Sequence, residues 1–322
     1  MSQLVLVTGG TGTLGKYVVP ALAEAGYSIR LLSRDAEKAK ELFKKIKPQV
    51  TELDLVTASE NELSEACSGV DFVVHLAGVV DFSLSQQQIN SINALPAGLL
   101  ASAAKKQKVK KFVFASSTSL YHNPGGAVNE SSPLTPSNAY GKSKILAEQL
   151  IRESGVPFVF LRITTIYGAG FENGFLPVAK MIKKEKLPLL GSGENLISLV
   201  HASDVANAFV LSLKKPVVNE AMIISGPSIK QSECLNELAD LFGVARPKKK
   251  VSVWMGVLLA YVDGVRSFLL RKKRRLYPEY VKVLSDNRVF DCSKAEKMLG
   301  WKARVDFKDG LEEFVSSVNN KV

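Results

Sequence analysis

Residues 4–15 read Leu-Val-Leu-Val-Thr-Gly-Gly-Thr-Gly-Thr-Leu-Gly, and this stretch decides the fold. The apolar run Leu4–Thr8 predicts a short buried strand, and helical periodicity then runs over Leu14–Ala25. A glycine-rich turn between a strand and a helix lets backbone N–H groups approach a pyrophosphate, and the helix N-terminus adds its positive dipole end. Because a predicted strand precedes the glycines and a predicted helix follows them, the stretch predicts dinucleotide binding rather than an ordinary strand–helix turn.

The chain outside this turn alternates in the same way. Further strands are predicted at Tyr27–Ser33, Val50–Asp54, Val70–Leu76, Phe112–Ser116, Phe158–Ile163 and Ala221–Ser225. Further helices are predicted at Ala36–Ile46, Asn61–Cys67, Ile89–Lys106, Tyr140–Ser154, Asp204–Leu213, Ser293–Leu299 and Gly310–Val318. This pattern indicates an α/β fold, a Rossmann-type doubly wound parallel sheet covered on both faces. The alternation weakens near residue 170, so we expect a nucleotide-binding domain at 1–170 and a smaller C-terminal substrate lobe at 171–322, with a blurred boundary.

Several positions are expected to contact the cofactor where the strands end. In the glycine-rich turn they are Gly9, Thr11, Gly12, Thr13, Leu14 and Gly15. At the ends of the next strands they are Ser33, Arg34, Asp54, Leu55, Ala77 and Gly78. A carboxylate ending the second strand would bind a ribose hydroxyl, whereas a cation there accepts the 2′-phosphate of NADP. Arg34 therefore favours NADP(H) over NAD(H). The alternative is that Arg34 is a solvated loop charge and that the Asp35 carboxylate binds the ribose hydroxyl. His75 is interpreted as a packed strand residue.

A second motif, Tyr140-Gly141-Lys142-Ser143-Lys144, supplies acid–base chemistry. Tyr140 and Lys144 are four residues apart, which places them on one helix face. An unperturbed phenol has a pKa near 10, and a nearby ammonium, together with the positive nicotinamide ring of the oxidised cofactor, favours the phenolate. The phenol can then exchange a proton with a substrate oxygen while hydride moves at carbon. The Ser116–Ser119 cluster, which follows a strand, would provide a hydroxyl that holds the substrate oxygen.

This ordered set of motifs resembles the extended short-chain dehydrogenase/reductase superfamily over nearly the whole chain. By register with that family's pattern, anchored on Tyr121, Ser117 takes the catalytic hydroxyl position. Asn93 matches the family's helix asparagine, which supports the lysine through water and backbone. The resemblance thus implies a catalytic set of Tyr140, Lys144, Ser117 and Asn93. Tyr140 and Lys144 are also expected to contact the cofactor, where Lys144 holds the nicotinamide ribose. A homodimer built on the helices around Asn93 and Tyr140 is common in the superfamily.

The branch of the superfamily is indicated by weaker features. Nucleotide-sugar epimerases and dehydratases usually carry a phosphate-binding arginine where this chain has Ile197. The segments 77–81, 191–195 and 290–301 look like the 3β-hydroxysteroid dehydrogenase and dihydroflavonol-reductase branch. That branch implies an NADP(H)-dependent oxidoreductase interconverting a secondary alcohol and a ketone on an apolar, steroid-, isoprenoid- or lipid-like substrate. The alternatives are a nucleotide-sugar epimerase or reductase, and a non-catalytic NADPH-binding sensor or assembly factor.

Charge is concentrated in one segment. The chain has 322 residues and a formal net charge of +11, of which residues 246–275 contribute +9. A uniform nucleic-acid-binding surface is therefore disfavoured, and no nucleic-acid partner is expected. Three scattered cysteines and three scattered histidines predict neither a disulfide framework nor a metal site.

The basic segment also contains an apolar helical stripe. At helical spacing, Trp254, Leu258, Tyr261, Val265 and Phe268 share one face, and Asp263 and Ser267 lie opposite. Clusters of cations at 248–250 and 271–275 flank it. Such a helix suits an anionic membrane surface; the alternatives are a helix packed on the lobe and another acidic partner. Because the N-terminus lacks a targeting pattern, we expect a cytoplasmic protein, with peripheral membrane contact through 246–275.

Overall fold

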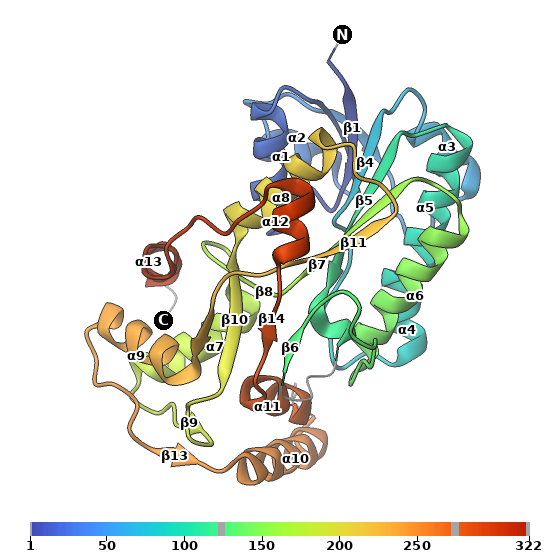
Figure 1. The fold of residues 1–322 in the computed structure, drawn as a ribbon. Helices are drawn as coiled ribbons and strands as arrows, with labels where there is room; N and C mark the ends of the chain where they lie inside the picture. The colour runs from blue at the N-terminus through green and yellow to red at the C-terminus, as the bar shows by residue number, and fades with distance from the viewer. Residues whose placement is uncertain (1, 122–125, 272–276, 320–322) are drawn as a thin grey trace.

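The main domain is built around a seven-stranded sheet (Figure 1). The computed structural model describes residues 2–121, 126–271 and 277–319. The strands of this sheet are β1 (Leu4–Thr8), β2 (Ser28–Ser33), β3 (Gln49–Glu52), β4 (Phe72–His75), β5 (Lys111–Ser117), β7 (Phe158–Ile163) and β11 (Glu220–Ile224). They lie in the order β11-β7-β5-β4-β1-β2-β3, and every neighbouring pair is parallel. The predicted Rossmann-type fold is confirmed.

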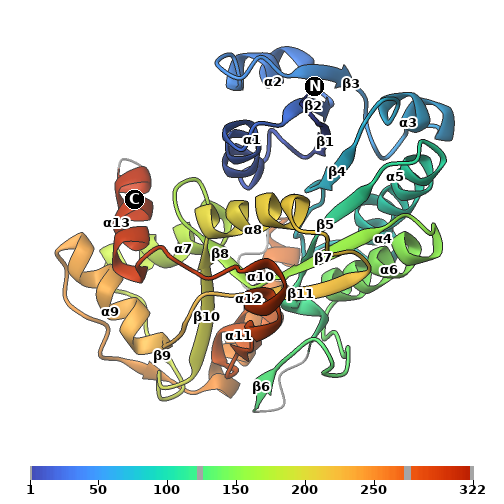
Figure 2. The same cartoon turned by 45° about the horizontal axis from the view of Figure 1, so that its top comes forward.

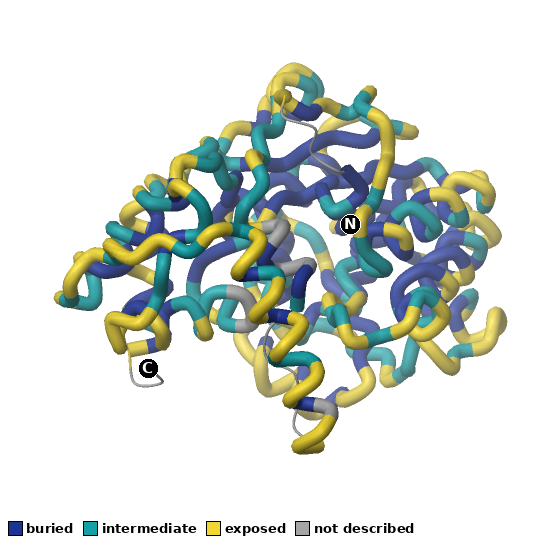
Figure 3. The backbone as a smooth tube through the Cα atoms, turned by 90° about the horizontal axis from the view of Figure 1, so that it is seen from below, coloured by how far each residue is buried: buried dark blue, intermediate teal, exposed yellow. Residues whose placement is uncertain are grey.

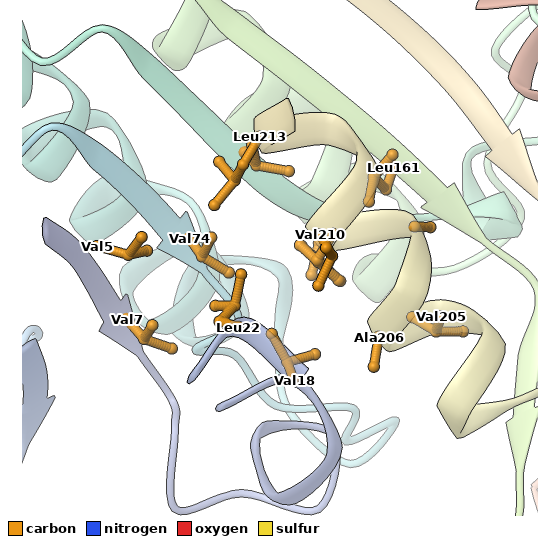
Figure 4. Close-up of a cluster of buried hydrophobic side chains, with 14 of the residues drawn as sticks. Val5, Val7, Val18, Leu22, Val74, Leu161, Val205, Ala206, Val210 and Leu213 are labelled. Carbon is orange, nitrogen blue, oxygen red and sulfur yellow. The ribbon is translucent and has the colours of Figure 1, made fainter. Parts of the chain in front are cut away.

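Helices cover both faces of the sheet (Figure 2). They are α1 (Gly15–Glu24), α2 (Ala36–Leu42), α3 (Glu60–Ala66), α4 (Gln86–Asn93), α5 (Leu95–Lys106), α6 (Ala139–Glu153) and α8 (Ala202–Lys214). One face packs on α1 and α8, where Val18, Leu22 and Val205 meet the strand residues Val5 and Val74 (Figure 4). The other face packs on α3, α5 and α6. Burial on both faces explains why these strands are short, nearly continuous apolar runs.

The helix predicted over Ile89–Lys106 is two helices. Helix α4 ends at Asn93, and α5 begins at Leu95 with Pro96 in its first turn. Proline has no N–H to donate to the preceding turn, so a helix starts readily at this point but does not run through it. The break frees the end of α4 to turn Asn93 toward the ends of the strands.

The C-terminal lobe is assembled from small sheets and short helices. Its strands are β8 (Thr165–Tyr167), β9 (Leu189–Leu190), β10 (Leu196–His201), β12 (Ser228–Lys230) and β13 (Lys250–Val251), and the pair β6 (Ala127–Val128) and β14 (Val289–Phe290) lies beside them. Its helices are α7 (Glu172–Lys183), α9 (Gln231–Phe242), α10 (Val253–Leu269), α11 (Pro278–Ser285) and α13 (Phe307–Val318). An apolar cluster including Leu199, Leu238 and Phe314 fills the lobe.

The lobe and the main sheet are tied together by the chain itself. Strand β11 returns to pair with β7, and α12 (Ser293–Leu299) leads to the buried Trp301. The Trp301 indole donates a hydrogen bond of 2.8 Å to the Asp204 carbonyl oxygen in α8. Tyr17 in α1 donates to Glu313 in α13 at 2.9 Å. These contacts hold the lobe beside the ends of the main strands, where the predicted site residues gather.

Candidate active site

The glycine-rich turn forms a cradle that larger residues cannot make. Gly9 has a left-handed φ of 67°, and a Cβ added to it would lie 2.7 Å from the Ala77 nitrogen. A Cβ on Gly15 would lie 2.2 Å from the Gly10 carbonyl oxygen. Helix α1 starts at Gly15 with no side-chain hydrogen bond at its N-cap, Leu14. The Lys16 and Tyr17 N–H groups donate to the Gly12 and Leu14 carbonyl oxygens at 3.2 and 3.0 Å, so the turn is closed by backbone alone, and the positive end of the helix dipole faces it, which suits a pyrophosphate.

The second strand ends on Ser33, Arg34 and Asp35. Ser33 is buried, and its hydroxyl donates 3.0 Å to the Asp35 carbonyl oxygen. The Asp35 carboxylate is the N-cap of α2 and accepts from the Lys38 N–H at 2.9 Å. Arg34 is exposed between them. The carboxylate of Asp35 therefore already has a structural role at the start of α2, and the Arg34 cation projects from the strand end.

The next two strand ends complete the edge. Asp54 accepts a hydrogen bond from the Val56 N–H at 3.0 Å, and Leu55 packs partly buried against the core. His75 lies at the end of β4. A 2.7 Å hydrogen bond joins its Nδ1 to the Thr8 hydroxyl. Burial lowers the pKa of His75 to about 3, with a smaller contribution from Lys144. His75 is thus a neutral, packed residue, as its position in a strand suggests.

Asn93 fixes the loop that follows β4. Its Oδ1 accepts from the Val79 N–H at 2.8 Å, and its Nδ2 donates to the Val79 carbonyl oxygen at 2.9 Å. Nδ2 also lies 3.4 Å from the Ser143 hydroxyl. Gly78 sits inside this arrangement, since a Cβ there would lie 3.2 Å from Asn93 Oδ1 and 3.6 Å from Lys144 Nζ. Asn93 thereby places the Gly78 backbone beside the lysine.

Lys144 is fully enclosed beneath the loop. Its Nζ donates 2.8 Å to the Ala115 carbonyl oxygen and lies 4.5 Å from the centre of the Phe114 ring. Burial lowers the Lys144 pKa to about 8, and Glu148 opposes the shift. A buried lysine with a perturbed pKa at the ends of parallel strands is characteristic of a functional site.

Tyr140 and Ser117 meet because of a glycine. A Cβ on Gly141 would lie 2.2 Å from the Ser119 carbonyl oxygen, so only glycine lets α6 start this close to the end of β5. The Asn138 side chain caps α6 by accepting from the Gly141 N–H at 2.8 Å. As a result Tyr140 lies close enough to Ser117 for the Ser117 hydroxyl to lower the Tyr140 pKa, while that hydroxyl donates to the Ser119 hydroxyl at 3.1 Å. The two motifs, far apart in sequence, therefore form one site.

The protonation of Tyr140 in the protein without cofactor is set by burial. Burial raises the Tyr140 pKa to about 12, and the Ser117 hydroxyl only partly offsets this. Lys144 was expected to lower that pKa, but its Nζ is directed at Ala115 and lies 5.8 Å from the Tyr140 ring centre. The phenol is therefore protonated at neutral pH in this structure.

A buried ionic network behind the site was missed by sequence reasoning. Arg162 in β7 donates to both carboxylate oxygens of Glu148 in α6, at 3.0 and 2.7 Å. Ser116 donates to the same carboxylate at 2.6 Å, and Arg162 reaches the Tyr121 hydroxyl at 2.5 Å. The signal was present in the Leu161-Arg162 pair and in Glu148, one turn after Lys144.

Ile197 is part of the lobe core. It lies on β10 opposite Ile229 in β12 and packs partly buried against the apolar cluster of the lobe. Among the described residues, no group of three or more histidine, cysteine or acidic side chains is arranged to hold a metal ion. The described cysteines, Cys67, Cys234 and Cys292, are all free thiols.

The fold and the cradle define a dinucleotide-binding protein of the Rossmann class with a Tyr–Lys–Ser arrangement at the strand ends. Residues 5–224 match the model of the NAD dependent epimerase/dehydratase family, and the chain belongs to that family. This confirms the resemblance to extended short-chain dehydrogenases/reductases. The chain is thus a member of a family of nicotinamide-dependent enzymes.

Relatives of more than one chemistry align over nearly the whole chain. A putative UDP-glucose 4-epimerase from Methanocaldococcus jannaschii is 28% identical, over 98% of this chain and 99% of its own length. A decarboxylating sterol-4-alpha-carboxylate 3-dehydrogenase from Dictyostelium discoideum is 25% identical, over 96% and 99%. The crystal structure of UDP-glucuronic acid 4-epimerase from Bacillus cereus with NAD has a TM-score of 0.78, at 21% identity and 99% coverage of both chains.

Proposed function

We propose that this protein is an NADP(H)-dependent oxidoreductase that interconverts a ketone and a secondary alcohol on an apolar substrate. The observation that carries the proposal is the placement of Tyr140 beside Ser117, with the Lys144 ammonium enclosed on the same helix. A nicotinamide cofactor, when bound, supplies or accepts the hydride at the substrate carbon. The protein's own residues must orient the oxygen and move the proton.

Each residue has a distinct role in this scheme. Ser117 donates a hydrogen bond to the ketone oxygen and holds it next to the phenol. Tyr140, protonated at neutral pH because burial raises its pKa to about 12, gives its proton to that oxygen as the carbonyl carbon is reduced. The protonated phenol is the form that reduction of a ketone requires. Lys144 provides a donor for the cofactor ribose, and Asn93 holds the Gly78 loop against it.

The cradle fits the dinucleotide for a structural reason. Gly9 and Gly15 leave the space that a Cβ would fill, and the start of α1, which has no side-chain cap, turns the positive end of its dipole toward the pyrophosphate. Thr11, Gly12, Thr13 and Leu14 line the same turn, and Asp54, Leu55 and Ala77 lie at the adjoining strand ends. The Arg34 guanidinium binds the 2′-phosphate, because the Asp35 carboxylate caps α2 by accepting from the Lys38 N–H.

The apolar substrate class rests on exposed apolar residues that are close to the catalytic residues in the sequence, and on Ile197. Val79, Val80 and Leu134 are 39%, 61% and 39% exposed, and they flank Gly78 and Tyr140 in the chain. Ile197 offers no charge where sugar-nucleotide enzymes carry arginine. The sterol dehydrogenase among the relatives acts on a substrate of this kind by its name. A nucleotide-sugar epimerase is the second candidate, favoured by the epimerase relative at 28% identity.

Titration calorimetry with NADPH and NADH tests the cofactor assignment. NADPH is expected to bind at least about tenfold more tightly, because a guanidinium pairs well with a phosphate. Arg34→Gln should weaken NADPH binding by about that factor and leave NADH binding unchanged. The matched control is Lys45→Gln, which removes an exposed charge elsewhere. Equal affinity for the two cofactors, or an equal loss for both in Arg34→Gln, would remove the NADP(H) assignment.

A further inference from the structure

Helix α10 turns its large apolar side chains away from the protein. Trp254, Leu258, Tyr261, Val265 and Leu269 are 67%, 52%, 60%, 62% and 72% exposed. Trp254, Leu258, Tyr261 and Val265 belong to the predicted apolar stripe, and their shared exposure confirms its helical spacing. The side chain of Phe268, the fifth residue of the stripe, is outside the described part of the structure. The stripe therefore faces solvent, and α10 is mostly yellow when the molecule is seen from below (Figure 3).

The opposite face of α10 is small and packed. Gly256, Ala260 and Ser267 are buried, and a Cβ on Gly256 would lie 3.0 Å from the Val281 side chain in α11 and 3.2 Å from Leu190 in β9. The helix is thus seated on the lobe through its small residues. The packed-helix alternative would place the stripe inside, and the structure places it outside.

Cations border the exposed stripe. Lys248, Lys249 and Lys250 precede α10 and are exposed, and Arg266 and Arg271 at its far end are also exposed. In sequence the basic run continues to residue 275, although residues 272–275 lie outside the described part of the chain. An apolar helix face bordered by lysine and arginine at both ends is the pattern of a helix lying in a membrane interface.

The dimensions favour lying on a bilayer over crossing it. Helix α10 has 17 residues, about 26 Å at 1.5 Å per residue, and Arg266 interrupts its apolar face. None of the helices in the described ranges is long and apolar enough to span a bilayer. The helix lies at the end of the molecule toward which the main strands run (Figure 1).

We propose that α10, with the cations at 248–250 and 271, docks this protein on the surface of an anionic lipid bilayer. Charge decides between the two occupants that an apolar helix face could have. A second copy would bring two segments of net charge +9 together, whereas anionic headgroups would neutralise them. This inference stands apart from the reaction, since vesicle binding requires no turnover.

Flotation with liposomes tests the docking. The protein is mixed at about 0.1 M salt with vesicles of pure phosphatidylcholine, or with vesicles of phosphatidylcholine mixed with the anionic lipid phosphatidylglycerol. We expect the protein to float with the anionic vesicles and far less with the neutral ones. The double variant Leu258→Gln/Val265→Gln and the triple variant Lys248→Gln/Lys249→Gln/Lys250→Gln should each bind at least about tenfold more weakly.

Matched controls separate docking from general loss of apolar or basic surface. Val56→Gln/Val218→Gln changes two exposed apolar residues elsewhere, and Lys45→Gln/Lys105→Gln/Lys214→Gln removes three exposed cations elsewhere; both should float like the wild type. Wild type that stays unbound, or α10 variants that float equally well, would overturn the proposal. So would a wild-type dimer in light scattering that Leu258→Gln/Val265→Gln converts to monomer, since a second copy would then cover the face.

Discussion

At the scale of single residues, the site depends on side chains whose charge is set by burial. Burial keeps Tyr140 protonated, lowers the pKa of Lys144 to about 8, and keeps His75 neutral beside Thr8. Sequence spacing predicted that Tyr140 and Lys144 share a helix face, because that geometry is local. Spacing carries no information about desolvation, so the protonation of Tyr140 became visible only once its surroundings were known.

His75 should make the fold sensitive to acid. Its pKa is about 3 in the folded protein and about 6.5 in an unfolded chain, so the unfolded state binds more protons between these values. Stability is therefore full above pH 6.5 and is lost as the pH falls toward 3. Between pH 8 and pH 5 the loss from this residue is about 2 kcal/mol.

Urea unfolding at pH 8, 6.5 and 5 measures this contribution. His75→Phe keeps the ring contacts with Phe112 and Phe114 and removes the titrating group. The free energy of unfolding of the variant should fall less over this range than that of the wild type, whatever its absolute value. Parallel pH dependences for the two proteins would show that His75 does not titrate on unfolding.

At the scale of elements, contacts at two places hold α6: at its N-terminus next to Tyr140, and one turn after Lys144. Gly141 lets its N-terminus approach Ser119, and Glu148 joins its middle to Arg162 in β7. Burial opposes the Arg162 charge, but Glu148 more than compensates and raises the Arg162 pKa. The glycine-rich turn was predictable because strand, turn and helix are contiguous. The Glu148–Arg162 pair was not, since it forms only when β7 pairs with β5.

Breaking that pair should unfold the protein more easily. Glu148→Gln leaves the buried Arg162 guanidinium without a countercharge, and we expect a loss of about 3–5 kcal/mol in the free energy of unfolding. Glu153→Gln, on the same helix but exposed, should change it by less than about 0.5 kcal/mol. Thermal or urea denaturation monitored by circular dichroism compares the two variants. Equal stabilities would mean that the network contributes little to holding α6.

At the scale of the molecule, the main sheet was predictable and the lobe was not. The parallel strands are apolar runs separated by amphipathic helices, and all seven strands of the sheet were anticipated to within a few residues. The lobe strands β6, β9, β13 and β14 have two residues each, and they exist only through pairing with distant partners. Helical spacing likewise predicted the apolar stripe of α10, but only packing on α11 decides which face is exposed.

The central claim is net hydride transfer to an apolar ketone through Tyr140. The decisive measurement is the rate of NADPH oxidation, followed by absorbance, with a panel of steroid and isoprenoid ketones, for wild type and Tyr140→Phe. UDP-glucose and UDP-galactose are tested in parallel for interconversion without net oxidation. We predict turnover of a ketone by the wild type and a loss of at least about a hundredfold in Tyr140→Phe with unchanged NADPH affinity. Sugar interconversion without ketone reduction, or full turnover by Tyr140→Phe, would contradict the account.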